Sequence, residues 1–285
     1  MHRKQVEGDR EITLRTTPRY GGSTFSFMWN ETALSAMRKQ QRLGLDTFDV
    51  IMVPGHCWHE ELSPQQRLEF AGMLRQEGLR IDSLNLPALD LNLASCLPQV
   101  RAYAVSLYTQ VLRMSAELGG RGIVVVPGRI SALFPPPSPD SEAWLTDGIE
   151  QLLKVAERED QQIFLELHPQ TPLPTSEKMH RFLKGVPHPR LLVAYDVSNA
   201  EFVSENQVES IRMLGSRIGQ VHLSDGTRTS WRHDRIGLGT VGFAAILQAL
   251  ADIGYQDTNI LEIISHDPLK DIVLSLESLA AYSRA

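Results

Sequence analysis

Residues 122–127 read Gly-Ile-Val-Val-Val-Pro, and residues 162–167 read Gln-Ile-Phe-Leu-Glu-Leu. Both segments are short runs of β-branched and aliphatic side chains with little alternation between polar and apolar residues. A strand of this kind is buried on both faces, which is typical of a parallel sheet covered by helices. These two segments therefore indicate an α/β fold.

Segments of the same kind recur along the chain and alternate with amphipathic stretches. Eight strands are predicted, at residues 24–28, 48–53, 79–86, 122–127, 162–167, 191–196, 218–223 and 258–264. The intervening stretches carry apolar side chains three and four residues apart, which predicts helices. The segment Ser63-Pro64-Gln65-Gln66 has the residues of a capping box and predicts a helix start. Strict alternation gives an open doubly wound sheet or a closed barrel, and eight units favour a single (β/α)8 TIM barrel.

The composition is that of an ordinary globular protein. The chain has 285 residues, of which 42% are hydrophobic, and a formal net charge of −6. A mildly acidic protein is a poor partner for nucleic acid, which is bound through clustered Lys and Arg. No apolar run of about 18 residues predicts a membrane span. We expect an N-terminal arm over residues 1–19, one barrel over residues 20–285, a cytoplasmic location, and neither nucleic-acid nor membrane partners.

Four polar residues interrupt the apolar strands at comparable positions: Glu166, Asp196, His222 and Glu262. They stand toward the C-terminal ends of the fifth to eighth predicted strands, the end at which TIM barrels carry out their chemistry. Each alone could be a salt-bridge partner or a hydrogen-bonded core residue. Three carboxylates buried together are costly unless a cation compensates them. The set therefore predicts one divalent metal ion, with Mn²⁺, Mg²⁺ or Co²⁺ suited to these ligands and Zn²⁺ as another option.

Five short motifs occur in an order that is typical of one family. They are Leu-Glu-Leu-His at 165–168, Tyr-Asp-Val-Ser-Asn at 195–199, Val-His-Leu-Ser-Asp at 221–225, Gly-Leu-Gly-Thr-Val-Gly-Phe at 237–243 and Leu-Glu-Ile at 261–263. With these motifs the chain resembles the xylose isomerase-like barrels, which include sugar epimerases, inosose-type isomerases and dehydratases, and endonuclease IV. The resemblance extends from about residue 21 to the C-terminus, and it implies the same barrel fold.

The resemblance also implies roles for particular residues. The metal ligands would be the four residues on the strand ends, and Glu166 and Glu262 would in addition exchange protons with the substrate. Arg228, six residues after His222, would contact substrate oxygens.

The chain departs from the family pattern at three places. Asn199 stands where the family often has a histidine, and we expect it at the substrate. Pro172 stands where ketose 3-epimerases carry a second glutamate. Leu238 and Thr240 lie in the glycine-rich segment where the family often has a glutamate.

Two histidines are further candidates for substrate binding because of their positions. His56 follows the second predicted strand, and His168 lies two residues beyond Glu166. Either imidazole could hydrogen-bond to a sugar hydroxyl or act as the acid in a dehydration.

A divalent ion chelated by a hydroxyl and a neighbouring carbonyl oxygen lowers the barrier to removing the proton on the adjacent carbon, which gives an enediolate. Return of the proton to the opposite face is epimerisation, return to the neighbouring carbon is isomerisation, and loss of a β-hydroxyl is dehydration. We therefore expect a metal-dependent isomerase or epimerase of a small keto sugar or polyol. The alternatives are a lyase acting on an inosose- or dehydroshikimate-like substrate and a non-enzymatic sugar-binding barrel.

Endonuclease IV chemistry is disfavoured because it needs further histidine ligands. The third predicted strand has none, and Asn199 takes the place of the histidine near the sixth strand. By analogy with barrels of this sort, we expect a homodimer.

Overall fold

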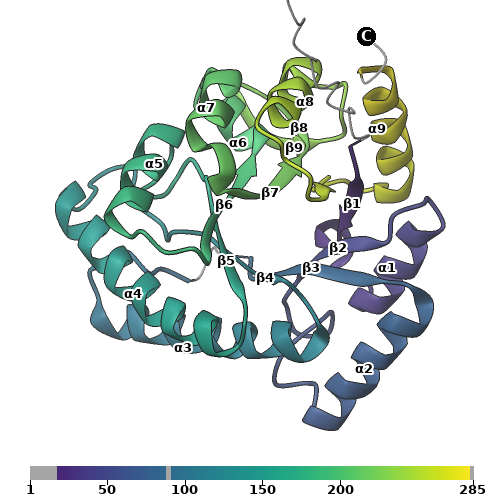
Figure 1. Ribbon diagram of the computed structural model, residues 1–285, viewed down its shortest axis with the longest axis horizontal. Helices are drawn as coiled ribbons and strands as arrows, with labels where there is room; N and C mark the ends of the chain where they lie inside the picture. The colour runs from purple at the N-terminus through teal and green to yellow at the C-terminus, as the bar shows by residue number, and fades with distance from the viewer. Residues whose placement is uncertain (1–17, 88–90, 283–285) are drawn as a thin grey trace, which may run out of the picture.

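A computed structural model describes residues 18–87 and 91–282. Eight parallel strands form a closed barrel in the order β1-β10-β7-β6-β5-β4-β3-β2 (Figure 1). These strands are β1 (Tyr20–Ser23), β2 (Thr47–Ile51), β3 (Arg80–Asn85), β4 (Gly122–Val125), β5 (Gln162–Glu166), β6 (Leu191–Asp196), β7 (Ile218–Leu223) and β10 (Asn259–Leu261). The predicted (β/α)8 barrel is confirmed. Residues 1–17 of the expected N-terminal arm lie outside the described residues, so the boundary of that arm stays a prediction.

Helices surround the barrel (Figure 1). They are α1 (Ala33–Gln41), α2 (Pro64–Glu77), α3 (Pro98–Leu118), α4 (Ser138–Arg158), α5 (Ser176–Gly185), α6 (Val197–Phe202), α7 (Gln207–Leu214), α8 (Phe243–Asp252) and α9 (Pro268–Tyr282), with short 3-10 helices η1 (Phe25–Phe27) and η2 (Gly215–Arg217). The predicted capping box starts α2: Ser63 Oγ accepts from the Gln66 N–H, and the Gln66 side chain accepts from the Ser63 N–H. Within residues 18–87 and 91–282, no helix has the length and apolarity that crossing a membrane requires.

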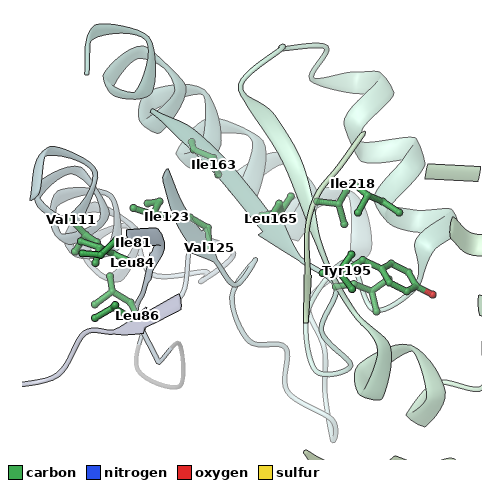
Figure 2. Close-up of a cluster of buried hydrophobic side chains, with 14 of the residues drawn as sticks. Ile81, Leu84, Leu86, Val111, Ile123, Val125, Ile163, Leu165, Tyr195 and Ile218 are labelled. Carbon is green, nitrogen blue, oxygen red and sulfur yellow. The ribbon is translucent and has the colours of Figure 1, made fainter. Parts of the chain in front are cut away.

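The barrel strands are buried on both faces, as their sequences indicate. Ile123 and Val125 of β4 belong to the large core between the strands and the helices, together with Val111 of α3 (Figure 2). The intervening Val124 belongs instead to a small separate cluster with Phe164 and Ala194. Because successive side chains of a strand point to opposite faces, the small cluster lies in the barrel interior.

The first predicted strand is wrong in its position. The structure places β1 at Tyr20–Ser23, and residues 25–27 of the predicted strand form η1. A Cβ atom on Gly21 would lie 2.4 Å from the Thr47 carbonyl oxygen. Glycine in a strand often marks close approach of another backbone, and here it lets β1 pack directly against β2. The segment Tyr-Gly-Gly-Ser therefore forms a strand in spite of its low intrinsic preference.

Two elements that the sequence analysis did not predict follow β6 and β7. The first is α6, which begins directly after Asp196. The second is an antiparallel hairpin formed by β8 (Asp225–Thr227) and β9 (Ser230–Asp234). Both lie at the C-terminal end of the barrel, where they extend its rim.

The glycine in β1 gives a prediction for stability. We expect Gly21→Ala to lower the free energy of unfolding by about 1–3 kcal/mol, because the added methyl group forces β1 away from β2. Gly72→Ala is the matched control, since Gly72 lies in α2 and nothing occupies the space around its Cβ position. The control should raise the free energy of unfolding by about 0.5–1 kcal/mol. Urea denaturation measures both, and equal effects of the two substitutions would contradict the close-packing argument.

Candidate metal centre and active site

The four polar side chains singled out in the sequence come together at the C-terminal mouth of the barrel. Glu166 and Asp196 end β5 and β6, His222 lies near the end of β7, and Glu262 follows β10 directly. One potential ligand atom from each lies within 4.8 Å of the others, and all four side chains are buried. The His222 Nδ1 atom is 3.7 Å from Glu166 Oε1, 4.0 Å from Asp196 Oδ2 and 3.5 Å from Glu262 Oε2.

The order of strands in the barrel sets this arrangement. The four residues stand on the adjacent strands β5, β6, β7 and β10, with Asp196 directly beside His222 in the register. The two glutamates occupy the ends of this arc, and the aspartate and histidine lie between them. Glu166 and Glu262 therefore reach the cluster from different sides.

Two atoms of the cluster are left without a hydrogen-bond partner although they are buried, Asp196 Oδ2 and His222 Nδ1. The other oxygen of Asp196 is occupied, because it accepts from the Asn199 backbone N–H at 2.6 Å. A buried polar atom without a partner is costly in a folded protein. The donor set, three carboxylates and one imidazole, together with these two unpaired atoms, fits a divalent cation.

The electrostatics of the cluster favour positive charge at its centre. Burial raises the pKa of Asp196 to about 7 because its charge is poorly solvated there. Burial acts in the same direction on Glu262, but the His222 and His233 imidazoles outweigh it and hold the pKa of Glu262 well below its usual range. The His222 pKa is raised well above its ordinary value: burial disfavours its charge, and the adjacent carboxylates overcome this effect.

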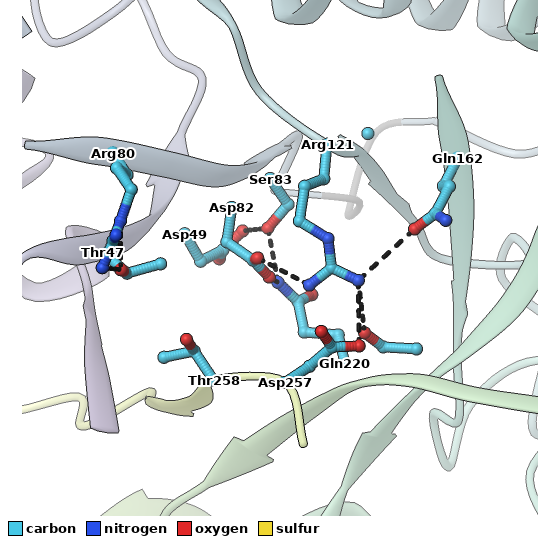
Figure 3. Close-up of polar contacts among 12 residues, drawn as sticks. Thr47, Asp49, Arg80, Asp82, Ser83, Arg121, Gln162, Gln220, Asp257 and Thr258 are labelled. Atoms are coloured by element: carbon cyan, nitrogen blue, oxygen red, sulfur yellow. Dashed lines mark hydrogen bonds and ion pairs between the residues drawn. The ribbon is translucent and has the colours of Figure 1, made fainter. Parts of the chain in front are cut away.

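A chain of hydrogen bonds below the cluster fixes the orientation of His222. The Gln220 Nε2 atom donates to Asp82 Oδ2 at 2.7 Å and to Ser83 Oγ at 2.7 Å (Figure 3). Because the ionised carboxylate of Asp82 only accepts, the Gln220 amide nitrogen must face it. The Gln220 Oε1 atom then faces His222 Nε2 at 3.1 Å and accepts a hydrogen bond from its N–H group. The Nδ1 atom of His222 is thereby directed toward the three carboxylates, as in histidines that bind metals.

Further polar side chains hold Gln220 in place from the barrel interior. Arg121 forms ion pairs with Asp82 at 2.8 Å and with Asp257 at 3.0 Å (Figure 3). Asp49 accepts hydrogen bonds from Ser83 and, at 2.9 Å, from Asn85, and burial raises the pKa of Asp49 to about 7. The imidazole of His222 is thus supported by a network that spans β2, β3 and β7.

A cavity of about 910 Å³ opens beside the cluster. Glu166 and Glu262 line it, together with His168, Asn199 and His233. Cavities of about 300–1,000 Å³ are typical of small-molecule sites. The cluster and the cavity therefore form one continuous candidate active site.

Two of the four residues predicted at the substrate line this cavity. The His168 ring packs edge-on against Trp231, with ring centroids 4.9 Å apart, and burial lowers the pKa of His168. Both polar atoms of the Asn199 side chain have protein partners: Nδ2 donates to the Leu167 carbonyl at 2.9 Å, and Oδ1 accepts from Trp231 Nε1 at 2.7 Å. Asn199 therefore orients Trp231 beside the cavity.

The structure does not bring the other two predicted residues to the cavity. The buried His56 imidazole is hydrogen-bonded to the Glu31 carbonyl and, at 2.9 Å, to Thr24 Oγ1. It therefore holds the loop after β2 against the segments that precede η1 and α1. Arg228 lies in the turn between β8 and β9 with its side chain 61% exposed, and it pairs with Glu201 at 3.3 Å. Neither residue is among those that line the cavity.

The sequence analysis missed His233, which lies on β9 and lines the cavity. Its Nδ1 atom is 3.3 Å from Glu262 Oε2 and 3.6 Å from Asp196 Oδ2. Burial disfavours the charged imidazole, but the carboxylates of Asp196 and Glu262 outweigh this effect and raise the pKa of His233 to about 9. His233 could have been found from its position in the sequence, because it lies in the segment that follows the strand of His222, and such segments surround the mouth of a barrel.

Comparisons with known proteins agree with this fold. An uncharacterized protein of Methanocaldococcus jannaschii, MJ1311, is 25% identical over 273 residues, which cover 93% of this chain and 89% of that protein. The D-psicose 3-epimerase of Ruminiclostridium cellulolyticum is 23% identical over 243 residues, 82% of this chain and 79% of the epimerase. The crystal structure of a D-tagatose 3-epimerase-like protein has the same fold, with a TM-score of 0.81 at 24% identity over 93% of this chain and 97% of that one.

The family model described as a xylose isomerase-like TIM barrel matches residues 37–282. This range includes all four residues of the cluster and most of the barrel. The chain belongs to the xylose isomerase-like TIM barrel family.

Proposed function

We propose that the protein is a divalent-metal-dependent isomerase or epimerase that acts on a keto sugar or polyol. The observation that carries this proposal is the buried cluster at the barrel mouth, in which Asp196 Oδ2 and His222 Nδ1 have no hydrogen-bond partner. Similarity to a D-psicose 3-epimerase supports a sugar as the substrate.

The residues that would hold the cation are Glu166, Asp196, His222 and Glu262. When bound, a cation such as Mn²⁺, Mg²⁺ or Co²⁺ polarises the substrate carbonyl and makes the neighbouring carbon more acidic. Zn²⁺ also accepts such ligands. The protein contributes the orientation of the ligands, through Gln220 below His222 and the Asn199 backbone N–H beside Asp196.

Proton transfer falls to the two glutamates, since both line the cavity and approach it from different sides. One glutamate, in its ionised form, would remove the proton next to the carbonyl, and the other, in its protonated form, would give a proton to the enediolate and be left ionised. Return to the opposite face inverts the carbon, and return to the neighbouring carbon exchanges an aldose with a ketose. His168 is neutral because burial lowers its pKa, so it is suited to hydrogen-bond with a hydroxyl group.

Dehydration on an inosose- or dehydroshikimate-like substrate is the second candidate function. Loss of a β-hydroxyl requires a proton donor at the leaving oxygen. His233 lines the cavity, with its Nδ1 atom 3.3 Å from Glu262 Oε2, so it is the residue that would serve. Water loss gives a conjugated product with ultraviolet absorbance, whereas epimerisation does not.

The glutamates give the first functional prediction. We expect Glu166→Gln and Glu262→Gln each to slow metal-dependent exchange of the substrate C–H proton by at least about 10²–10⁴-fold, because each loses a proton-transferring carboxylate. The exchange is followed by NMR in D₂O with Mn²⁺-loaded protein and a panel of ketohexoses that includes D-psicose.

Glu201→Gln is the matched control for this measurement. Glu201 is also buried, but it pairs with Arg228 and Thr240 outside the cavity. We expect its exchange rate to remain close to that of the unsubstituted protein. Exchange that persists in both Glu166→Gln and Glu262→Gln would contradict the proton-transferring role of the two glutamates. Exchange that is absent from the unsubstituted protein with every ketose and cation would favour a sugar-binding barrel without turnover.

The network below His222 gives a second prediction. Gln220→Met keeps the side-chain volume but removes the acceptor for His222 Nε2, so the imidazole loses its fixed orientation. We expect the affinity for Mn²⁺ to fall by about 10–100-fold, as measured by calorimetric titration.

Gln161→Met controls for the loss of a buried amide. The Gln161 side chain is buried and donates to the Gly120 carbonyl at 3.1 Å, away from the cluster. Its affinity for Mn²⁺ should be unchanged. A similar loss of affinity in both variants would mean that general destabilisation, and not orientation of His222, accounts for the effect.

A further inference from the structure

The cavity beside the cluster has two chemically different halves. One half is formed by residues on or after β5, β6, β9 and β10, and it carries the acids, imidazoles and amide Glu166, His168, Asn199, His233 and Glu262. The other half is formed by segments that follow β1, β2, β3 and β4, with part of α3. Because β4, β3, β2 and β1 are consecutive in the barrel, these segments form one continuous wall opposite the cluster.

This second wall is mainly apolar. Its side chains include Phe25, Trp29, Met52, Trp58, Leu86 and Tyr103. Among the described residues, its charged side chain is that of Arg129 after β4, and the other charged side chains of the cavity belong to the opposite half. The one amide side chain of this wall, Asn85, already donates to Asp49 at 2.9 Å. A ligand that touches this wall therefore finds apolar surface and few hydrogen-bonding groups.

Two aromatic side chains of this wall are largely exposed to water. Trp29 is 74% exposed and Tyr103 is 60% exposed. They come from segments far apart in the sequence, the end of η1 and the helix α3, yet both line the same cavity. Exposed apolar surface that gathers at a cavity is characteristic of a binding site.

A free keto sugar matches only one half of this cavity. Hydroxyl groups surround such a molecule, and each hydroxyl buried against the apolar wall would exchange water for no partner, at a cost of about 1–3 kcal/mol. The volume of about 910 Å³ also lies in the upper part of the range that encloses drug-sized ligands, about 300–1,000 Å³. The cavity therefore has volume and apolar surface that a sugar ring alone would not occupy.

We infer that the substrate is a keto sugar that carries an apolar, aromatic substituent. The carbonyl and its neighbouring hydroxyl face the cluster of Glu166 and Glu262, and the aromatic group packs against the wall that contains Trp29 and Tyr103. This inference deepens the proposed function and rests on it for the reaction, whereas the preference for an aromatic group depends on the cavity alone.

The test compares two unreactive probes on the Mn²⁺-loaded protein, phenyl β-D-glucopyranoside and methyl β-D-glucopyranoside. The probes share the sugar and differ in the apolar group. We expect the phenyl glucoside to bind at least about tenfold more tightly in calorimetric titrations, since burial of apolar surface contributes about 25 cal/mol per Å² and about 1.4 kcal/mol corresponds to a factor of ten. Equal affinities for the two glucosides would overturn the inference.

Variants at the wall locate the effect. Trp29→Ala and Tyr103→Ala should each reduce the ratio of the two affinities by about threefold or more. Phe134→Ala is the matched control, because Phe134 is 90% exposed and does not line the cavity, so the ratio should be unchanged. A phenyl preference that survives both wall substitutions would also overturn the inference, because the aromatic group would then bind elsewhere.

The outcome is independent of the exchange assay. Exchange on free ketohexoses without any phenyl preference would leave the proposed function standing and remove the inference about the substituent. A phenyl preference that depends on Trp29 and Tyr103, in a protein that exchanges no ketose proton, would support the inference and count against the isomerase proposal.

Discussion

The mutual repulsion of three buried carboxylates is the constraint on which the site depends. Glu166, Asp196 and Glu262 share a small volume at the C-terminal mouth of the barrel, and all three are buried. Such a group persists only if positive charge lies among the oxygens, either on imidazoles or on a cation. The carboxylates therefore raise the pKa of His233 to about 9 and hold the pKa of His222 well above its ordinary value. A dication held by the four residues of the cluster would supply the same positive charge.

The barrel interior serves that constraint by fixing one imidazole. An ion pair between Arg121 and Asp82 orients the Gln220 amide, and the amide in turn directs His222. Asp82 lies on β3, Gln220 and His222 lie on β7, and Arg121 directly precedes β4, so these strands must keep their register for one nitrogen to point correctly. Buried polar networks are stabilising only when every member is satisfied. The network therefore explains why polar side chains occupy a barrel interior that apolar residues would otherwise fill.

The barrel and the four-residue cluster could be predicted because both depend on local patterns. Buried parallel strands read as apolar runs, and a charged residue at the end of such a run stands out. The position of β1 could not be predicted in this way, since Tyr-Gly-Gly-Ser becomes a strand only through close packing of Gly21 on Thr47. Contacts between distant segments decided that element.

The same limit applies to the residues around the substrate. The family resemblance pointed to Arg228, but the hairpin of β8 and β9 directs Arg228 outward and His233 inward. The segment has no apolar period from which a strand could be read, so neither the hairpin nor its inward face was visible. His56 illustrates the converse case: an imidazole at the expected end of the barrel is used to hold Thr24 and Glu31.

The order of strands links the chemistry to the choice of substrate. In the proposed reaction, proton transfer on both faces of a carbon needs a base and an acid on different sides of it, and Glu166 and Glu262 stand on different sides because β6 and β7 lie between β5 and β10. The four residues of the cluster occupy one continuous arc of the barrel. The remaining arc, β4 to β1, carries no member of the cluster and can be mainly apolar without weakening the site. In the site that we propose, a closed barrel of eight parallel strands would thus separate the reacting end of a substrate from the end by which it is recognised.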